Sequence, residues 1–103
     1  MANSVTIINF HKYLQAALEQ RASEIHFAVG QEPLFRVEGR LIPSSEGEVV
    51  STKFNAEIFN HFADDNSRRQ LEEEKEVRFA KTLENDTRFI FNAFYQKGNI
   101  SLS

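Results

Sequence analysis

Near the start of the chain, apolar residues recur at the spacing of an amphipathic helix. They fall at positions i, i+3, i+4, i+7 and i+8: Phe10, Tyr13, Leu14, Ala17 and Leu18. Asn9 directly precedes this stripe and is a good N-cap residue. The pattern predicts a helix that begins after Asn9 and runs to about Arg21. Residues 4–8 are expected to form a short strand or a loose tail.

Further along, the apolar pattern changes to strict alternation, as at Ile25, Phe27 and Val29. This period of two is typical of a half-buried strand. Three strands are predicted, separated by a turn at 30–33 and a tight turn at Glu38-Gly39: 25–29, 34–37 and 40–42. Because short turns join them, we expect an antiparallel meander.

Two more helices are predicted in the middle of the chain. The first covers residues 53–62, with Ser51 or Thr52 as its cap. The second covers about 67–75, and Leu71 is its only strongly apolar residue. We therefore expect this second helix to lie on the surface.

The segment 88–95 carries apolar residues on both of its alternating faces for most of its length. Such a strand is usually central in its sheet. A strand at 77–80 precedes it, and a last strand begins at Asn99 and is expected to be unfinished at Ser103. The order of elements predicts one α+β domain over residues 1–103, with helices packed on an antiparallel sheet.

The composition argues against several classes of function. Phe supplies ten residues, Tyr two and Trp none, so a core can be built from large side chains with few polar groups. The net charge of −3 argues against a nucleic-acid partner, whose binding needs a basic surface. Without Cys there is no disulfide, thiol nucleophile or thiolate metal site. The absence of Cys makes a cytosolic location the simplest interpretation. No apolar run approaches the roughly 20 residues of a membrane span.

The sequence contains no motif for catalysis or for binding a phosphate. Neither G-x-x-x-x-G-K-[ST] nor G-x-G-x-x-G occurs, and G-x-S-x-G and H-E-x-x-H are also absent. His11, His26 and His61 come from separate predicted elements without metal-ligand spacing. The acidic run 72–74 occupies successive helical positions, which point in different directions and cannot converge on one ion. We therefore expect no catalytic residue and no metal site.

A few polar residues on the predicted strands and turns remain candidates for binding. His26 is most simply a half-buried imidazole that is hydrogen-bonded to backbone, or alternatively a contact residue at an interface. Arg36, Arg40 and Arg88 are either surface residues with their stems on apolar neighbours or charges that project toward a negative partner. Such a partner could be a phosphate bound in another domain.

A set of residues from almost the whole chain carries a more specific pattern. They are Ala22-Ser23-Glu24-Ile25-His26-Phe27, Gly30, Pro33, Arg36-Val37, Gly39-Arg40-Leu41, Leu71-Glu72-Glu73, Phe79-Ala80, Arg88-Phe89 and Asn92-Ala93-Phe94-Tyr95-Gln96. The first part resembles the signature A-S-D-[LI]-H…G…P…R-V-[DE]-G-x-L. That signature belongs to the N-terminal domain of the type IV pilus retraction ATPases, the PilT-type branch of the type II/IV secretion ATPase superfamily.

The resemblance implies a PAS-like fold and a role in a motor. In this family the domain precedes a RecA-like ATPase domain, and subunits form homohexamers in which the N-terminal domain of one subunit packs on the ATPase domain of its neighbour. The implied function is docking and coupling in a pilus retraction (twitching motility) or secretion motor, without catalysis by this domain. ATP and Mg²⁺ would serve the full-length parent. Its partner would be an inner-membrane platform protein, and its location cytoplasmic and peripheral to the bacterial inner membrane.

The resemblance also implies site residues. Arg36 and Arg88 match basic positions on the face toward the nucleotide cleft, where they would sense or stabilise phosphate. Ile90 stands where a second Arg is usual, and Arg78 replaces a usual Asp, so the charge of that face differs from the family pattern. Four residues are candidate interface contacts: His26, Arg40, Tyr95 and Gln96.

Two other functions remain open. A free-standing PAS-like sensor would enclose a small molecule in a cavity lined by several phenylalanines: Phe27, Phe35, Phe89 and Phe91. A filled interior would count against this function. The N-terminal domain of a type II secretion ATPase would share the fold, but the residues at 30–33 and 94–96 favour the pilus retraction branch.

Overall fold

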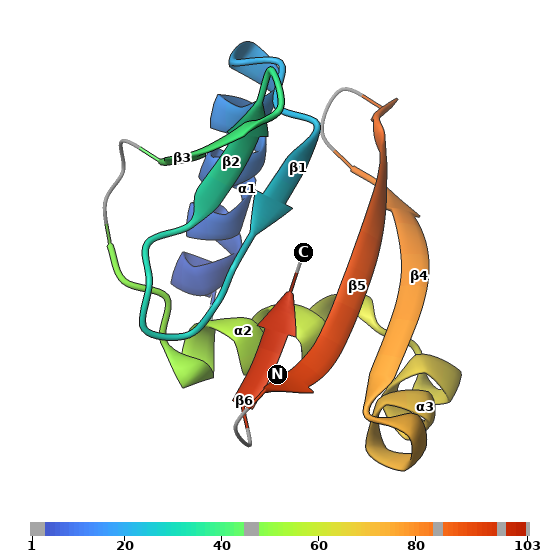
Figure 1. The fold of residues 1–103 in the computed structure, drawn as a ribbon. Helices are drawn as coiled ribbons and strands as arrows, with labels where there is room; N and C mark the ends of the chain where they lie inside the picture. Colours follow the sequence, from blue (N-terminus) through green and yellow to red (C-terminus); the bar gives the residue numbers. More distant parts are fainter. Residues whose placement is uncertain (1–3, 45–47, 84–85, 97–98, 103) are drawn as a thin grey trace.

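The computed structural model describes residues 4–44, 48–83, 86–96 and 99–102. Within these ranges the chain forms three helices and six strands (Figure 1). In chain order they are α1 (Ser4–Glu19), β1 (Glu24–His26), β2 (Leu34–Val37), β3 (Arg40–Pro43), α2 (Thr52–Phe62), α3 (Asp65–Glu74), β4 (Glu76–Thr82), β5 (Arg88–Gln96) and β6 (Asn99–Leu102).

α1 begins five residues before Asn9, at Ser4, so the prediction of a strand or tail over residues 4–8 is wrong. The reason is that the apolar stripe starts one turn earlier. Ile7 lies three residues before Phe10 and packs against the same core, which continues the helical period toward the N-terminus. The predicted stripe itself is confirmed, because Phe10 and Leu14 are buried.

The end of α1 is a Schellman motif. The backbone N–H of Ala22 donates to the carbonyl of Ala17 (2.9 Å), and the N–H of Arg21 donates to that of Leu18 (3.1 Å). Arg21 occupies the left-handed region, with φ of 57°. These bonds satisfy carbonyls that the last helical turn would otherwise leave open, and they turn the chain directly into β1.

β1, β2 and β3 form one antiparallel sheet in that order, which confirms the predicted meander. The ladder between β2 and β3 ends with Val37 opposite Arg40, so a two-residue turn joins the two strands. Both turn residues have positive φ, 51° at Glu38 and 80° at Gly39, which is the type I′ geometry that matches the twist of the strands. β1 ends at His26, three residues earlier than predicted.

Side chains cap both middle helices. The Ser51 hydroxyl accepts from the N–H of Phe54 (3.0 Å) at the start of α2. At the start of α3, the Asp64 carboxylate accepts from the N–H of Ser67 (2.7 Å). This backbone hydrogen bond favours the ionised form and holds the pKa of Asp64 below its usual range. Because Asp64 caps it, α3 begins at Asp65, two residues before the predicted start.

β4, β5 and β6 form a second antiparallel sheet, with β5 in the middle as predicted. Its ladder aligns Val77 with Ala93 and Phe79 with Phe91. Val77, Phe91 and Ala93 are buried, so this face points into the core. A single antiparallel sheet was expected, but the described residues form two sheets with no ladder between them. The physical reason is that a cleft lies between β1 and the first half of β5, which keeps these two strands from pairing.

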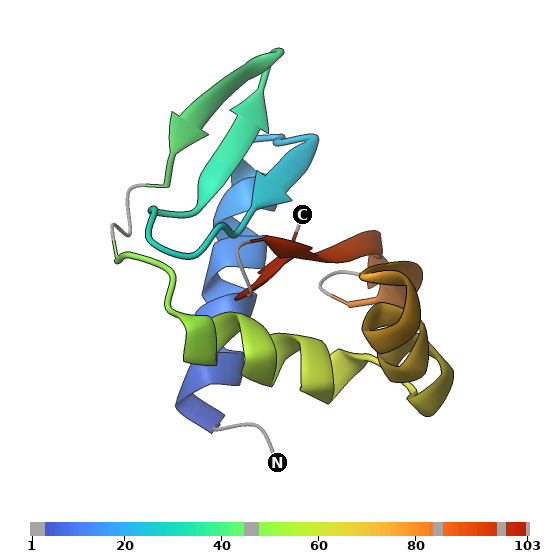
Figure 2. The same ribbon diagram turned by 60° about the horizontal axis from the view of Figure 1, so that its bottom comes forward.

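The core lies between the sheets and the helices α1 and α2, which cover the sheets from one side (Figures 1 and 2). Its centre is a cluster of phenylalanine rings. Phe10 packs against Phe62 (5.4 Å between centroids), Phe27 (5.6 Å) and Phe91 (6.0 Å), and Phe91 stacks on Phe79 at 4.9 Å. This arrangement confirms the single α+β domain, while PAS-like remains a prediction.

Candidate docking face

The register of the first sheet places a charged group on its solvent side. Ile25 packs against the core and Phe35 is fully buried. Because side chains alternate along a strand, Glu24, His26 and Arg36 point away from the core. Glu24 lies directly opposite Arg36.

Glu24 holds both of its neighbours. Its carboxylate lies 3.1 Å from Nε of Arg36 and 3.0 Å from Nε2 of His26. The Arg36 guanidinium also donates to the carbonyl of Gly39 (3.2 Å). His26 is half-buried as predicted, but its partner is a carboxylate and not the predicted backbone group. The charge of Arg36 is therefore partly offset, and an incoming phosphate would have to compete with Glu24.

A second basic group lies on the solvent side of the other sheet. Arg78 of β4 pairs with Asn92, and Arg88 of β5 pairs with Thr82. All four positions alternate with the buried residues, so both arginines project from the same face. Both are exposed, and neither forms an ion pair with a side chain in the described part of the chain. Their charges are therefore available for a partner.

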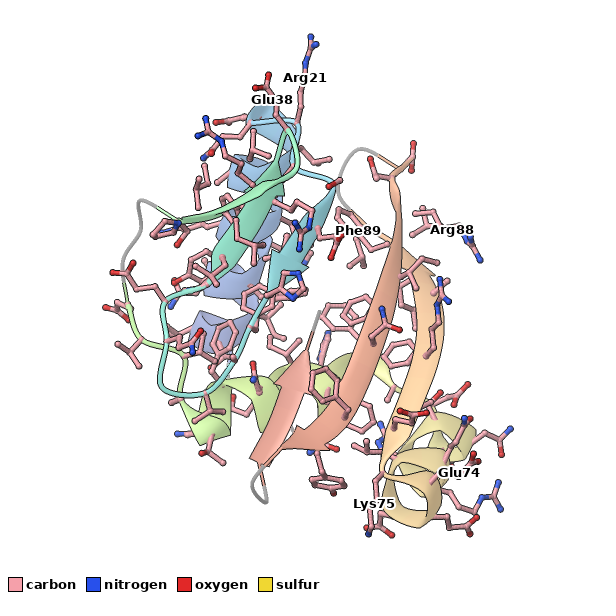
Figure 3. The ribbon with its side chains drawn as sticks, in the orientation of Figure 1. Arg21, Glu38, Glu74, Lys75, Arg88 and Phe89 are labelled. Atoms are coloured by element: carbon pink, nitrogen blue, oxygen red, sulfur yellow. The ribbon has the colours of Figure 1, made fainter. Side chains whose placement is uncertain are left out.

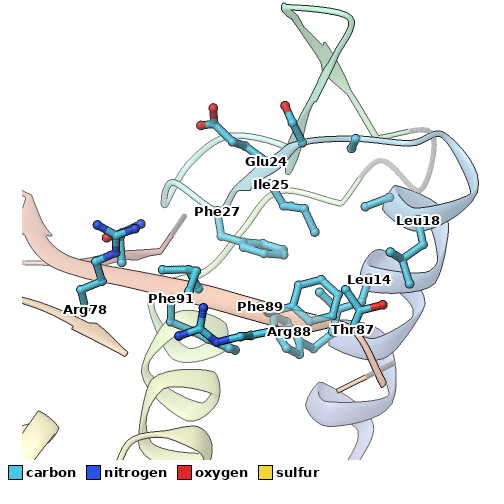
Figure 4. A pocket seen from close by; sticks show the side chains of 16 residues that line it. Leu14, Leu18, Glu24, Ile25, Phe27, Arg78, Thr87, Arg88, Phe89 and Phe91 are labelled. Atoms are coloured by element: carbon cyan, nitrogen blue, oxygen red, sulfur yellow. The ribbon is translucent and has the colours of Figure 1, made fainter. Parts of the chain in front are cut away.

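A cleft of about 410 Å³ separates the two charged groups. It is bounded by α1, β1 and the first half of β5, and Arg78 and Arg88 lie at its margin (Figure 4). Its apolar lining includes Leu14, Ile25, Phe27, Phe89 and Phe91. Glu24 and Arg88 both line this cleft, although they are far apart in the sequence.

The other predicted interface residues lie elsewhere. Arg40 is exposed at the start of β3, beside the hairpin turn. Tyr95 is 38% exposed at the far end of β5, where Nζ of Lys75 approaches its ring (5.5 Å to the centroid). Seven residues of extended strand separate it from Arg88, a span of about 23 Å. The backbone of Gln96 pairs with Asn99, and its side chain lies outside the described residues.

Sequence reasoning treated Arg78 as a departure from a family pattern and did not assign it a role. The signal that could have found it is strand alternation together with the ladder. Once β4 and β5 pair antiparallel, Arg78 and Arg88 share a face, but the register that aligns them is not visible in either strand alone.

Within the described ranges, no group of three or more His, Asp or Glu side chains could hold a metal ion. No helix in those ranges has the length and apolar character needed to cross a bilayer.

Two solved structures share this fold. A crystal structure of the pilus retraction motor PilT with bound ADP superposes with a TM-score of 0.78 and 25% identity over 88% of this chain. The X-ray structure of the Legionella pneumophila ATPase DotB superposes with a TM-score of 0.76 and 22% identity over 92%. The chain spans 26% and 27% of those two proteins' lengths. No family model matches the chain, and no curated protein matches it.

Proposed function

We propose that this chain, which has the fold of the N-terminal domain of PilT-type secretion ATPases, is the docking and coupling domain of an ATP-driven motor. The observation that carries the proposal is the match to the pilus retraction motor PilT over 88% of the chain with a TM-score of 0.78. The residues that resemble the PilT-type signature are distributed over the same length. The motor drives pilus retraction or secretion.

The same proposal implies the other parts of the motor, which are an ATPase domain, an oligomer and a membrane partner. The chain spans about a quarter of the PilT chain that it matches, so the proposed full-length parent also holds an ATPase domain that binds ATP and Mg²⁺. The parent acts as a homohexamer on an inner-membrane platform protein, at the cytoplasmic side of that membrane. This domain binds the ATPase domain of its own or a neighbouring subunit and transmits changes in its position.

The ion pairs of the arginines near the cleft distinguish the two candidate phosphate contacts, Arg36 and Arg88. Arg36 is already bound to Glu24 and Gly39, whereas Arg78 and Arg88 form no ion pair with any described side chain. Arg88 is therefore a better candidate than Arg36 for contact with a negative group on the ATPase domain, including a nucleotide phosphate. Arg78 adds a second positive charge on the same face of the sheet and compensates for the charge missing at Ile90.

A binding measurement tests this assignment. The chain is titrated onto an ADP-loaded PilT-type motor that lacks its own N-terminal domain, and binding is followed by calorimetry. We expect Arg88→Ala to weaken binding roughly tenfold, because hydrogen bonds to charged groups are worth about 1.5–3 kcal/mol. Arg69→Ala is the matched control, since Arg69 is exposed on α3 and bonds only to Asn66 among the described residues. Equal losses for both variants, or no binding of the unsubstituted chain, would contradict the proposal.

The proposed role also requires that the chain alone does not hydrolyse ATP. It lacks the glycine-rich loop that cradles phosphates. We expect no turnover above the buffer rate in a phosphate-release assay. Turnover that survives purification under denaturing conditions and refolding would refute a purely coupling role.

A small-molecule sensor is the second candidate function, because the cleft is lined by three of the four predicted phenylalanines: Phe27, Phe89 and Phe91. Its volume of about 410 Å³ lies in the range of ligand pockets. Phe35 is fully buried and does not line it. Native mass spectrometry of the purified chain distinguishes the two functions: a stoichiometric copurifying ligand favours the sensor, and an unliganded mass favours the docking domain.

A further inference from the structure

β3 is an edge strand that carries exposed apolar side chains on both of its faces. It pairs with β2 on one side, and in the described chain no strand pairs with its other side (Figure 2). Leu41 is 44% exposed on the solvent face, and Ile42, which lies opposite the buried Phe35, is 36% exposed on the core face. Apolar residues on both faces are typical of a strand with neighbours on both sides. An open apolar edge is a template for a further strand.

The hydrogen bonds beside β3 show which of its backbone groups are open. The N–H of Ser44 donates to the carbonyl of Pro33 (2.9 Å). Because these groups alternate along an antiparallel strand, the even-numbered residues of β3 also direct theirs toward β2. Leu41 therefore directs its N–H and its carbonyl outward. Pro43 also faces outward, with a carbonyl but without an N–H.

These open groups are complementary to the same edge of a second copy of the chain. We propose that β3 is a self-association edge, at which two copies pair antiparallel about a two-fold axis at Leu41. In this register the N–H of each Leu41 donates to the Leu41 carbonyl of the second copy. The two three-stranded sheets then form one continuous antiparallel sheet.

Pro43 fits this register although it cannot donate. It lies opposite Gly39 of the second copy, and an N–H at this position would donate to the Gly39 carbonyl. That carbonyl already accepts from the Arg36 guanidinium of its own copy (3.2 Å). A partner strand of another sequence would have a carbonyl opposite Pro43 without a donor. The proline therefore favours a second copy as the occupant.

The side chains of the paired edges also match. On the solvent face the two Leu41 side chains lie directly opposite each other, and the neighbouring Arg36 is already paired with Glu24 (3.1 Å). The contact between the leucines is therefore not flanked by uncompensated like charges. On the core face each Ile42 lies opposite Arg40 of the second copy, whose aliphatic stem covers it.

The contact is small, because β3 has four residues. Interfaces below about 1,200 Å² belong to weak or transient complexes, so we expect association at millimolar concentration. A two-fold contact uses the same patch of both copies, and β3 lies on the opposite edge of its sheet from β1 and the cleft. Self-association through β3 is therefore independent of the proposed docking through Arg88.

Dilution of the isotope-labelled chain from millimolar to micromolar concentration tests the proposal, followed by sedimentation equilibrium and by NMR hydrogen exchange. We expect a dimer at the higher concentration. On dilution, exchange of the Leu41 amide should become at least roughly twofold faster, because its hydrogen bond exists only in the dimer. Exchange of the Ile42 amide should change less, because this amide faces β2 in the single copy as well.

A substitution at the two-fold axis adds a second test. Leu41→Lys places two like charges directly opposite each other, and we expect it to weaken association at least roughly tenfold. Ile8→Lys is the matched control, since Ile8 is an aliphatic residue of α1 that is 54% exposed, and it should associate like the unsubstituted chain.

Three results would overturn the proposal. The unsubstituted chain could stay monomeric at millimolar concentration, exchange of the Leu41 amide could be independent of concentration, or the two lysine variants could associate equally. The first two measurements use the unsubstituted chain, so they do not depend on how well either variant folds. None of these outcomes depends on the proposed motor role.

Discussion

At the scale of single residues, four non-glycine residues of the described chain have left-handed backbone: Arg21, Glu38, Lys75 and Asp86. Figure 3 labels the first three, which lie where the chain changes direction. For an L-residue this conformation costs roughly 1–2 kcal/mol. Arg21 ends α1, and Lys75 ends α3 with its N–H donating to the carbonyl of Leu71. The folded state tolerates this cost because each residue completes a helix cap or a hairpin.

Replacing Arg21 with glycine should therefore stabilise the protein. The left-handed conformation costs glycine little, so we expect Arg21→Gly to raise the free energy of unfolding by about 1 kcal/mol, measured by urea denaturation. Gly39→Ala is the opposite control. It adds a Cβ at φ of 80° with no neighbouring atom within 4 Å, so any loss it causes is due to the backbone alone. A loss of stability in Arg21→Gly would contradict this account of the α1 terminus.

Asp64 links stability to pH. Its pKa is lowered in the folded state, chiefly by the backbone hydrogen bond from Ser67. A lowered pKa means that the ionised cap contributes stability above the unfolded pKa of about 3.9, and that this contribution is lost as pH falls through the folded value. We expect the melting temperature of the native chain to fall more between about pH 5 and pH 3 than that of Asp64→Asn. Asparagine still caps the helix but does not titrate, so parallel pH curves would contradict the assignment.

At the scale of elements, Asn55 connects α2 to the end of β1. Its side-chain amide is fully buried and donates to the carbonyl of Phe27 (2.8 Å). Phe27 is itself part of the core and of the cleft. The bond therefore holds one wall of the cleft on the helix layer.

Removing this side chain should destabilise the fold. Asn55→Ala leaves the Phe27 carbonyl without this donor, and we expect a loss of about 1–3 kcal/mol in the free energy of unfolding. Asn60→Ala on the same helix changes an exposed side chain and should have little effect. Chemical denaturation measures the free energy of unfolding of both variants. Equal values for Asn55→Ala and Asn60→Ala would show that the buried hydrogen bond does not contribute to stability.

The local sequence predicted most elements because each has a clear period or a clear cap. The stripe of α1 and the double-faced pattern of β5 are local signals. The prediction missed residues 4–9 of α1 and the early start of α3 because these depend on Ile7 and Asp64. The roles of these two residues are visible only when the neighbouring turn is helical. Patterns within a single segment of the sequence predict no more of the structure than these elements.

At the scale of the whole molecule, the two sheets and the cleft between them depend on contacts between residues far apart in the chain. The sequence indicated that Arg36 and Arg88 were candidates. It did not indicate that Glu24 forms an ion pair with Arg36 or that Arg78 and Arg88 lie on the same face of the sheet. Both facts arise from strand register. Register is set by the whole ladder, so no pattern within one segment could reveal it.

In the proposed function, this domain couples to an ATPase through Arg78 and Arg88. A chimera tests this coupling: the N-terminal domain of a PilT-type motor is exchanged for this chain, and ATP hydrolysis by the chimeric motor is measured. We expect the chimera to support more turnover than the motor without an N-terminal domain, and we expect Arg78→Ala with Arg88→Ala in the chimera to remove this gain. Equal turnover of the unsubstituted and the doubly substituted chimera would refute coupling through these two arginines.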